Sequence, residues 1–105
     1  MFFAITCIDR PNSAALRVAT RPAHIAYVDG IGRRLLLAGP LLDDAGGVTG
    51  SLLVVEAADR AAAERFAAAD PYKQADLFSS VVIQGFNVSI KDGARLSYIS
   101  DQRAS

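Results

Sequence analysis

The sequence predicts an α+β domain of the ferredoxin-like class, in which one four-stranded antiparallel sheet carries two helices on one face. Segments with strand character and segments with helical character follow one another in the order β-α-β-β-α-β. That order is typical of a split βαβ unit, and right-handed crossovers place both of its helices on the same face. The length of 105 residues and the apolar fraction of 51% suit one domain with a modest core.

The first predicted strand, residues 2–8, carries apolar side chains on both faces, so we expect both faces of the sheet to be covered. A helix follows, with Asn12 as its N-cap and its end near Gly30. Pro22 interrupts the helical pattern. Either the helix is kinked there, or a second segment begins with Pro22 in its first turn.

Two strands joined by a turn follow the first helix. Residues 33–38 form the second predicted strand, and Gly39-Pro40 after it is typical of an edge strand or a bulge. The turn at residues 43–47 is rich in Asp and Gly. Residues 50–56 form the third strand, so this part of the chain predicts a hairpin with a moderately long loop.

The second predicted helix, residues 60–69, is rich in alanine and begins after Asp59, a favourable N-cap residue. Asp70-Pro71 ends this helix, because the residue before a proline is disfavoured in helical conformation. Residues 72–77 are compatible with one further short turn of helix.

The fourth predicted strand, residues 80–90, completes the domain that we assign to residues 1–90. Residues 91–105 form a C-terminal extension that opens with a Lys-Asp-Gly turn. The segment LSYIS, residues 96–100, either adds a short strand or has no regular structure.

The net charge and the pattern of apolar residues indicate which kinds of binding partner the protein has. The chain has 11 basic and 11 acidic residues, and this formal net charge of zero gives no support for nucleic-acid binding. We expect a cytoplasmic protein without membrane contact, because no signal-peptide pattern or spanning apolar segment is found. Since two helices cover one sheet face, we expect the other face to stack on a second copy in a sheet-to-sheet homodimer.

The chain offers few reactive side chains. It has a single cysteine, Cys7, which excludes an internal disulfide and lies in an apolar run that predicts burial. One histidine and one cysteine supply no zinc-ligand set, and no glycine-rich nucleotide motif is present. We therefore expect neither a metal nor an organic cofactor.

His24 and Asp70 are the predicted catalytic residues. His24 lies twelve residues after Asn12, Asp70 lies eleven residues after Asp59, and both helices begin at the same end of the sheet. At a rise of about 1.5 Å per residue, both side chains lie about 17 Å along their helices from the cap residues. A carboxylate there can orient an imidazole for general acid–base work. The alternatives are a structural histidine and an aspartate that only bonds the backbone after it.

Three further residues are candidates for binding a small-molecule ligand. Arg21 lies one turn before His24 and suits a carboxylate or phenolate oxygen; the alternative is a solvated arginine. Tyr72 can close one side of a pocket, or it can simply pack in the core. Ser51 lies at the start of a strand, where its hydroxyl can donate to a ligand or have no function.

Four segments, residues 21–24, 37–40, 50–51 and 69–72, resemble in order and spacing those of the YciI-like family. This family belongs to the superfamily of dimeric ferredoxin-like α+β barrels. The resemblance covers about residues 1–90, and it implies an α+β domain that forms a dimer.

The resemblance also implies a site built around a histidine and an aspartate, which match His24 and Asp70. It implies a relation to muconolactone isomerase-like enzymes and monooxygenases, and some family members are credited with dehydrochlorination of chlorinated hydroxyquinols. The sequence departs from the family at residues 84–87, where many relatives carry a basic residue and often a tryptophan. If the fourth strand lines the pocket, the substrate is expected to differ.

We therefore expect a small homodimeric lyase or isomerase, similar to a dehydrochlorinase. His24 is expected to move a proton and Asp70 to orient the imidazole. Arg21, Ser51 and Tyr72 are expected to bind a small oxygenated molecule that is cyclic or aromatic. One alternative is a non-catalytic dimeric module that binds a metabolite or a partner protein. Another is a structural dimer that binds no ligand.

Overall fold

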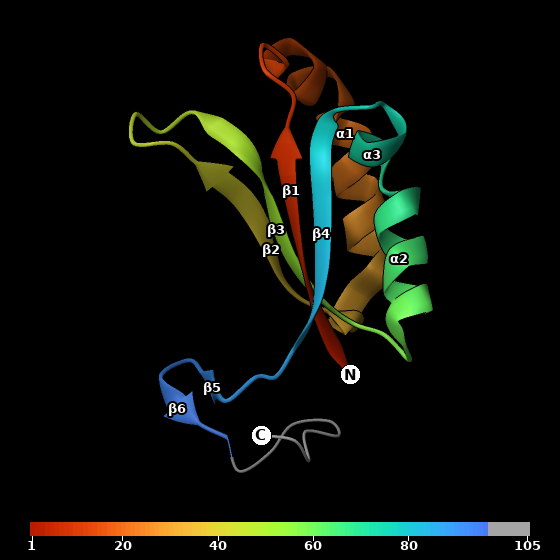
Figure 1. The fold of residues 1–105 in the computed structure, drawn as a ribbon, viewed down its shortest axis with the longest axis vertical. Coiled ribbons are helices and arrows are strands. Elements are labelled where there is room, and N and C mark those ends of the chain that lie inside the picture. The colour runs from red at the N-terminus through yellow and green to blue at the C-terminus, as the bar shows by residue number, and fades with distance from the viewer. Residues whose placement is uncertain (97–105) are drawn as a thin grey trace.

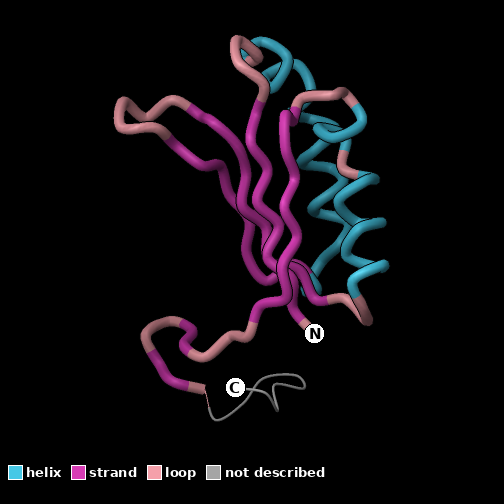
Figure 2. Tube along the Cα trace, viewed as in Figure 1, coloured by secondary structure: helices cyan, strands magenta, loops and turns pink. Residues whose placement is uncertain are grey.

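The structure is a computed structural model that describes residues 1–96, and it confirms the predicted ferredoxin-like α+β fold (Figure 1). The elements are β1 (Phe2–Asp9), α1 (Ala14–Ile31), a 3-10 turn (Gly32–Arg34), β2 (Leu35–Leu42), β3 (Val48–Glu56), α2 (Arg60–Ala69), α3 (Pro71–Gln74), β4 (Phe78–Phe86), β5 (Ile90–Lys91) and β6 (Ala94–Arg95). The main sheet is antiparallel in the order β2-β3-β1-β4. All three α-helices lie on one of its faces (Figure 2).

The main core lies between the sheet and the helices. Alternate residues of the central strand β1, namely Phe3, Ile5 and Cys7, are buried there, because successive side chains of a strand point to opposite faces. Leu53 and Val55 of β3 join them. The helices, the connection before β4 and the start of β4 complete this core with Ala63, Phe66, Tyr72, Leu77 and Phe78.

The start of α1 corrects the predicted N-cap. The helix begins at Ala14 with Ser13 as its N-cap residue, and Asn12 lies outside the helix at a φ of 59°. Asparagine tolerates this left-handed conformation better than most residues, so Asn12 forms the turn after β1 instead of capping. Pro22 lies within one continuous helix, where it removes only the hydrogen bond to the carbonyl of Val18. No helix in the described part of the chain is long and apolar enough to cross a membrane.

Both strands of the hairpin are longer than predicted, and β2 is also shifted toward the C-terminus. β2 runs over Leu35–Leu42 instead of residues 33–38, because Arg33 and Arg34 belong to the 3-10 turn that follows α1. β2 is an edge strand, as Gly39-Pro40 predicted. Its register shifts lie between Leu35 and Leu37 and between Leu41 and Leu42, so no bulge lies at Gly39-Pro40. β3 begins at Val48, two residues before the predicted start.

β4 ends four residues earlier than the sequence pattern predicts. It runs over Phe78–Phe86 and pairs with β1, and Phe86 lies opposite Phe2, the first residue of that strand. The ladder therefore has no partner for the residues after Phe86, although their apolar alternation continues.

The sheet face away from the helices carries a smaller apolar cluster. Phe2 and Val54 are buried in it together with Val88, which comes from the segment after β4. This C-terminal arm, residues 87–96, includes the β5–β6 hairpin around the predicted turn, which extends beyond one end of the sheet (Figure 1). Val88 and Leu96 of the arm join the apolar cluster at that end. The rest of the predicted strand at residues 96–100 lies outside the described residues.

Candidate functional site

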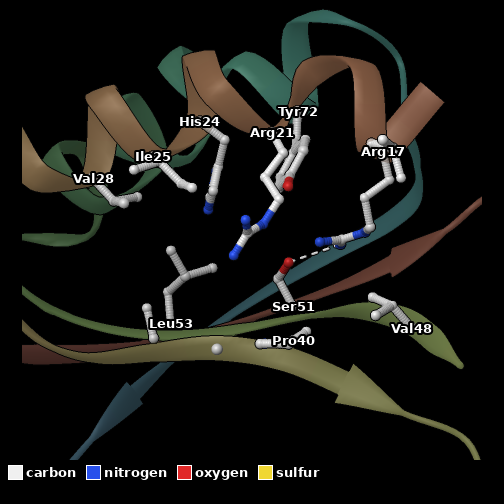
Figure 3. A pocket seen from close by; sticks show the side chains of 13 residues that line it. Arg17, Arg21, His24, Ile25, Val28, Pro40, Val48, Ser51, Leu53 and Tyr72 are labelled. Atoms are coloured by element: carbon white, nitrogen blue, oxygen red, sulfur yellow. Dashed lines mark hydrogen bonds between the residues drawn. The ribbon is translucent and has the colours of Figure 1, made fainter. Parts of the chain in front are cut away.

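A cavity of about 410 Å³ lies between α1 and the hairpin of β2 and β3, on the helix side of the sheet (Figure 3). A volume of this size suits a small molecule. Helix α1 contributes Arg17, Arg21, His24 and Val28, whose spacing of three and four residues puts them on one stripe of the helix.

His24 and Asp70 meet at this cavity, as the sequence predicts. Nδ1 of His24 lies 2.9 Å from Oδ1 of Asp70. Both side chains are largely buried, with exposed fractions of 15% and 4%. Because an ionised carboxylate only accepts hydrogen bonds, Nδ1 carries the hydrogen and donates it, and Nε2 is left free on the cavity side of the ring (Figure 3).

Asp70 has a second hydrogen bond that explains its rigid position. It is the N-cap of α3, and its Oδ1 also accepts the backbone N–H of Tyr72 at 2.9 Å. The backbone role considered for Asp70 and its pairing with His24 are therefore both present. Since Ser13 is the N-cap of α1, His24 and Asp70 each lie eleven residues after a cap residue. This equal spacing explains why the two side chains lie at a similar distance from the N-terminal ends of α1 and α2.

Tyr72 packs in the core and also lines the cavity. Its ring stacks on that of His24, and its edge contacts Phe78, with centroids 6.0 Å apart. Burial raises the pKa of the Tyr72 phenol, although the positive charges of Arg17 and Arg21 oppose this. The phenol therefore stays protonated at neutral pH and can donate a hydrogen bond.

Arg17 is a cavity residue that the sequence reasoning missed. Its Nε and Nη2 donate to the two carboxylate oxygens of Asp9 at 2.8 and 3.0 Å, and Nη2 also donates to Oγ of Ser51 at 2.9 Å. Its guanidinium carbon lies 4.5 Å from the ring centroid of Tyr72. Burial alone would lower the pKa of Arg17, but the hydrogen bond and charge of Asp9 raise it above its ordinary value.

A signal for Arg17 was present in the sequence. Arg17 precedes Arg21 by four residues and His24 by seven, so the three basic side chains share one helix face. Its partner Asp9 ends β1, and nothing in the sequence pattern indicates which cation lies across from that carboxylate.

Ser51 lies on the floor of the cavity and is only 4% exposed. Its oxygen accepts from Arg17, while its own hydroxyl hydrogen has no acceptor among residues 1–96. Ser51 therefore presents a fixed donor beside a fixed cation.

Arg21 also lines the cavity, but it is held differently from Arg17. Its side chain is exposed and has no hydrogen bond or ion pair within the described part of the chain. Figure 3 shows it extending from α1 between His24 and Ser51, toward the sheet. The five residues predicted from the sequence, His24, Asp70, Arg21, Ser51 and Tyr72, are therefore all brought to one place.

The remaining wall of the cavity is mostly apolar. Val18, Ile25 and Val28 line it from α1, and Leu53 and Val48 from β3. None of the lining residues comes from β4, so the departure from the family pattern at the end of this strand does not reach the cavity.

Two other features limit the chemistry that this region offers. Within residues 1–96, no three His, Cys, Asp or Glu side chains gather in a way that could hold a metal ion. Cys7 is buried as predicted, and burial together with the charge of Asp70 raises the pKa of its thiol to about 12. The thiol is therefore not a nucleophile at neutral pH.

Comparison with other sequences finds a family and several relatives. The sequence profile of the YCII-related domain matches residues 1–87. An uncharacterized protein of Haemophilus influenzae is 34% identical over 94 residues, which cover 82% of this chain and 96% of that protein. Protein YciI of Escherichia coli is 35% identical over 94 residues, with the same shares of 82% and 96%.

Comparison with solved structures finds a dehydrochlorinase with the same fold. It is the 5-chloro-2-hydroxyhydroquinone dehydrochlorinase TftG of Burkholderia phenoliruptrix, in complex with 2,5-dihydroxybenzoquinone. The TM-score is 0.76 at 31% identity, over 82% of this chain and 93% of that chain. An antibiotic biosynthesis monooxygenase shares the fold alone, with a TM-score of 0.51 at 14% identity over 82% and 98% of the two chains.

Proposed function

The chain belongs to the family of YCII-related domains, and from this premise we propose that it is a lyase or isomerase for small oxygenated ring compounds. The observation that carries this proposal is the contact of 2.9 Å between Nδ1 of His24 and Oδ1 of Asp70 at the edge of a cavity of about 410 Å³. In this proposal His24 is the proton-transferring group, and Asp70 is the residue that orients it.

The His24–Asp70 pair suits proton transfer because one residue carries the proton and the other holds the imidazole in place. Asp70 fixes the orientation of the ring, so Nε2 of His24 can take a proton from a bound molecule and return it later. Returning the proton to the same molecule at another atom would be an isomerisation. Releasing it together with a leaving group would be an elimination.

Arg17 and Ser51 suit the negative charge that such a step creates on a substrate oxygen. Arg17 is held by Asp9 and is already in place, and the free hydroxyl hydrogen of Ser51 lies beside it. Donors that are fixed before the reaction stabilise a developing oxyanion without the cost of reorganisation. We assign both residues to this role, and Tyr72 to supporting one side of the bound ring.

The similarity to TftG makes elimination of chloride the first reaction to test. That relative is named for 5-chloro-2-hydroxyhydroquinone, a ring with three hydroxyl groups and one chlorine. In the elimination, Nε2 of His24 takes a hydroxyl proton and delivers it to the ring carbon that carries chlorine, which gives a keto form. A second hydroxyl proton then leaves as chloride departs with its bonding electrons, so a hydroxyquinone is formed. The substrate loses one proton and one chloride, so no oxidant or reductant is required.

The test is chloride release from 5-chloro-2-hydroxyhydroquinone under argon, which prevents oxidation of the substrate by air. Wild type is expected to release chloride, and His24→Gln is expected to lose about 10²-fold or more of the rate. Arg65→Gln, an exposed change on α2, is the matched control and is expected to keep it. Circular dichroism of each variant checks the fold.

The same experiment distinguishes the alternative function. If wild type binds 2,5-dihydroxybenzoquinone but catalyses neither chloride release nor exchange of ring protons with deuterated water, the non-catalytic binding module is the correct description. If chloride release is equally fast in His24→Gln, the acid–base role of His24 is wrong.

We also propose that the protein is a homodimer in which the open sheet faces stack. Strand pairing places Val82 and Phe86 of β4 on the same face as Phe2, which the helices do not cover. Val82, Phe86 and Leu37 are 50%, 47% and 51% exposed there. A formal net charge of zero adds little repulsion between two copies. A cytoplasmic location stays a prediction.

Light scattering at low protein concentration tests the dimer. Wild type is expected at twice the chain mass of 11.1 kDa, and Val82→Glu is expected to give a monomer because two buried carboxylates would face each other. Val18→Glu, at a valine that is 72% exposed on α1, is expected to leave the dimer intact. A wild-type monomer would contradict the proposal.

A further inference from the structure

We propose that Arg21 makes the cavity prefer ring compounds that bear a carboxylate, so that a cyclic or aromatic acid binds more tightly than a neutral ring compound of the same shape. This inference rests on the proposed function, because it names the class of molecule on which His24 would act. It is carried by the difference between the two arginines of the cavity.

The two arginines differ in their charge partners. The guanidinium of Arg17 is neutralised by both oxygens of Asp9, and the Asp9 side chain is only 7% exposed. Arg21 has no hydrogen bond or ion pair with any residue of the described range 1–96. The charge of Arg17 is therefore paired within the protein, whereas all donors of Arg21 are available to a ligand.

The cavity lining has one positive charge that no carboxylate neutralises. Arg21 and Arg17 both line the cavity, but only Arg17 is paired with Asp9, and no Asp or Glu side chain is among the lining residues. Asp70 lies behind His24, where its Oδ1 is engaged by Nδ1 of the ring and by a backbone N–H. The charge of Arg21 thus faces the cavity without a carboxylate opposite it, which favours an anionic ligand.

The position of Arg21 fits a ligand with an apolar ring and one charged end. Arg21 extends between His24 and Ser51 in Figure 3, close to where a reacting group would lie. Ile25 and Leu53 provide an apolar surface for the ring itself. The planar guanidinium fork matches the two oxygens of a carboxylate better than a single phenolate oxygen.

The experiment compares two probes of the same shape and different charge, 4-hydroxybenzoate and 4-hydroxybenzamide. Binding is followed by amide NMR shifts of Ser51 and Leu53, which report on the cavity. Wild type is expected to bind the benzoate about tenfold more tightly than the benzamide, with the difference reduced by added salt. Arg21→Gln is expected to bind both about equally, because glutamine keeps the helix but removes the charge.

Two controls make the result specific. Arg65→Gln removes an exposed positive charge from α2 and is expected to keep the tenfold preference. Arg21→Lys is expected to keep part of it, because lysine retains the charge but not the fork.

The outcomes separate this inference from the function on which it rests. Equal binding of both probes to wild type, or a preference that survives in Arg21→Gln, would overturn the role of Arg21 and leave the His24 chemistry to the chloride assay. Absence of any shift at Ser51 and Leu53 with either probe would overturn both the inference and the assignment of a ring compound as ligand.

Discussion

The aromatic ring of Tyr72 lies face to face with the imidazole of His24, with the ring centroids 4.1 Å apart and the planes inclined by 18°. Asp70 holds the same imidazole through Nδ1 at 2.9 Å. The ring of His24 therefore has two independent supports, a hydrogen bond in its plane and a stacked ring on its face. Both limit the directions in which Nε2 can point, and such alignment is a large part of general acid–base catalysis.

The stacked pair predicts different effects for two substitutions of Tyr72. Tyr72→Phe keeps the ring and is expected to retain turnover within about tenfold, whereas Tyr72→Leu removes the stack and is expected to lose about 10²-fold. The chain contains one histidine, so its ring protons give a single set of NMR signals. These signals should move in Tyr72→Leu and stay nearly unchanged in Tyr72→Phe. Equal signals in both variants would show that the stack is absent in solution.

The charge of Asp70 is the second support to test. Asp70→Asn keeps an oxygen for the backbone N–H of Tyr72 but offers no carboxylate to Nδ1 of His24, so turnover should fall by about 10² to 10⁴-fold. Loss of the charged hydrogen bonds should lower the free energy of unfolding by about 1.5–3 kcal/mol. Asp59→Asn makes the same change at the N-cap of α2 and should leave turnover intact. Equal losses in the two variants would refute a special role for Asp70.

The ion pair of Arg17 and Asp9 is expected to matter for stability as well as for the site. Arg17→Met leaves a carboxylate that is 7% exposed without its partner and should cost about 3–5 kcal/mol in urea denaturation. The double change Arg17→Met with Asp9→Leu should recover much of this loss, because no buried charge remains.

An exposed ion pair provides the control for this prediction. Arg10 and Asp76 lie 2.8 Å apart with side chains 51% and 73% exposed. Arg10→Met should therefore cost less than about 1 kcal/mol. If Arg17→Met is no more costly than Arg10→Met, the buried pair contributes little to the fold.

The sequence predicted the fold and which five candidate residues come together, because their signals are local or follow from topology. The order of elements brings α1 and the start of α3 together, and equal spacing from two cap residues puts His24 and Asp70 at one height. Arg17 was missed for a different reason. Its role depends on Asp9 at the end of β1 and Ser51 on β3, and only the folded sheet brings these side chains near it.

The errors at element ends also have physical causes. Asn12 and Ser13 are both good cap residues, and only the conformation of the turn after β1 decides between them. The apolar alternation after Phe86 continues past the strand, but β1 has no residue left to pair with it. A pattern of side chains reports which face is apolar, and it does not report where the neighbouring strand stops.

The thiol of Cys7 predicts a specific pH dependence of stability. Its pKa is raised from 9.0 to about 12 in the folded protein, with burial as the main cause. Below pH 9 the thiol is protonated in both states. From pH 9 to about 12 the unfolded chain loses a proton that the folded protein keeps, so the free energy of unfolding should fall as the pH rises.

Urea denaturation between pH 8 and pH 10.5 measures this effect against Cys7→Ala. The raised pKa of Tyr27 and Tyr72 lowers stability in the same direction at still higher pH, and both residues are retained in the variant. Cys7→Ala should therefore show a smaller slope, even if its overall stability is lower. An identical slope would mean that the thiol ionises as readily in the folded protein as in the unfolded chain.

The close approach of β1 and β3 predicts that any side chain at Gly50 lowers the stability of the fold. A Cβ at Gly50 would clash with the backbone oxygen of Cys7 and lie 3.3 Å from Cα of Ile8, so the two strands would have to separate where Ser51 is positioned. Gly50→Ala should cost about 3 kcal/mol or more, at the upper end of overpacking effects. Gly39→Ala on the edge strand β2 meets no atom within 4 Å and should change stability little. Thermal unfolding of the two variants, read by circular dichroism, should therefore differ by many degrees, and equal melting temperatures would show that the strands can part there at little cost.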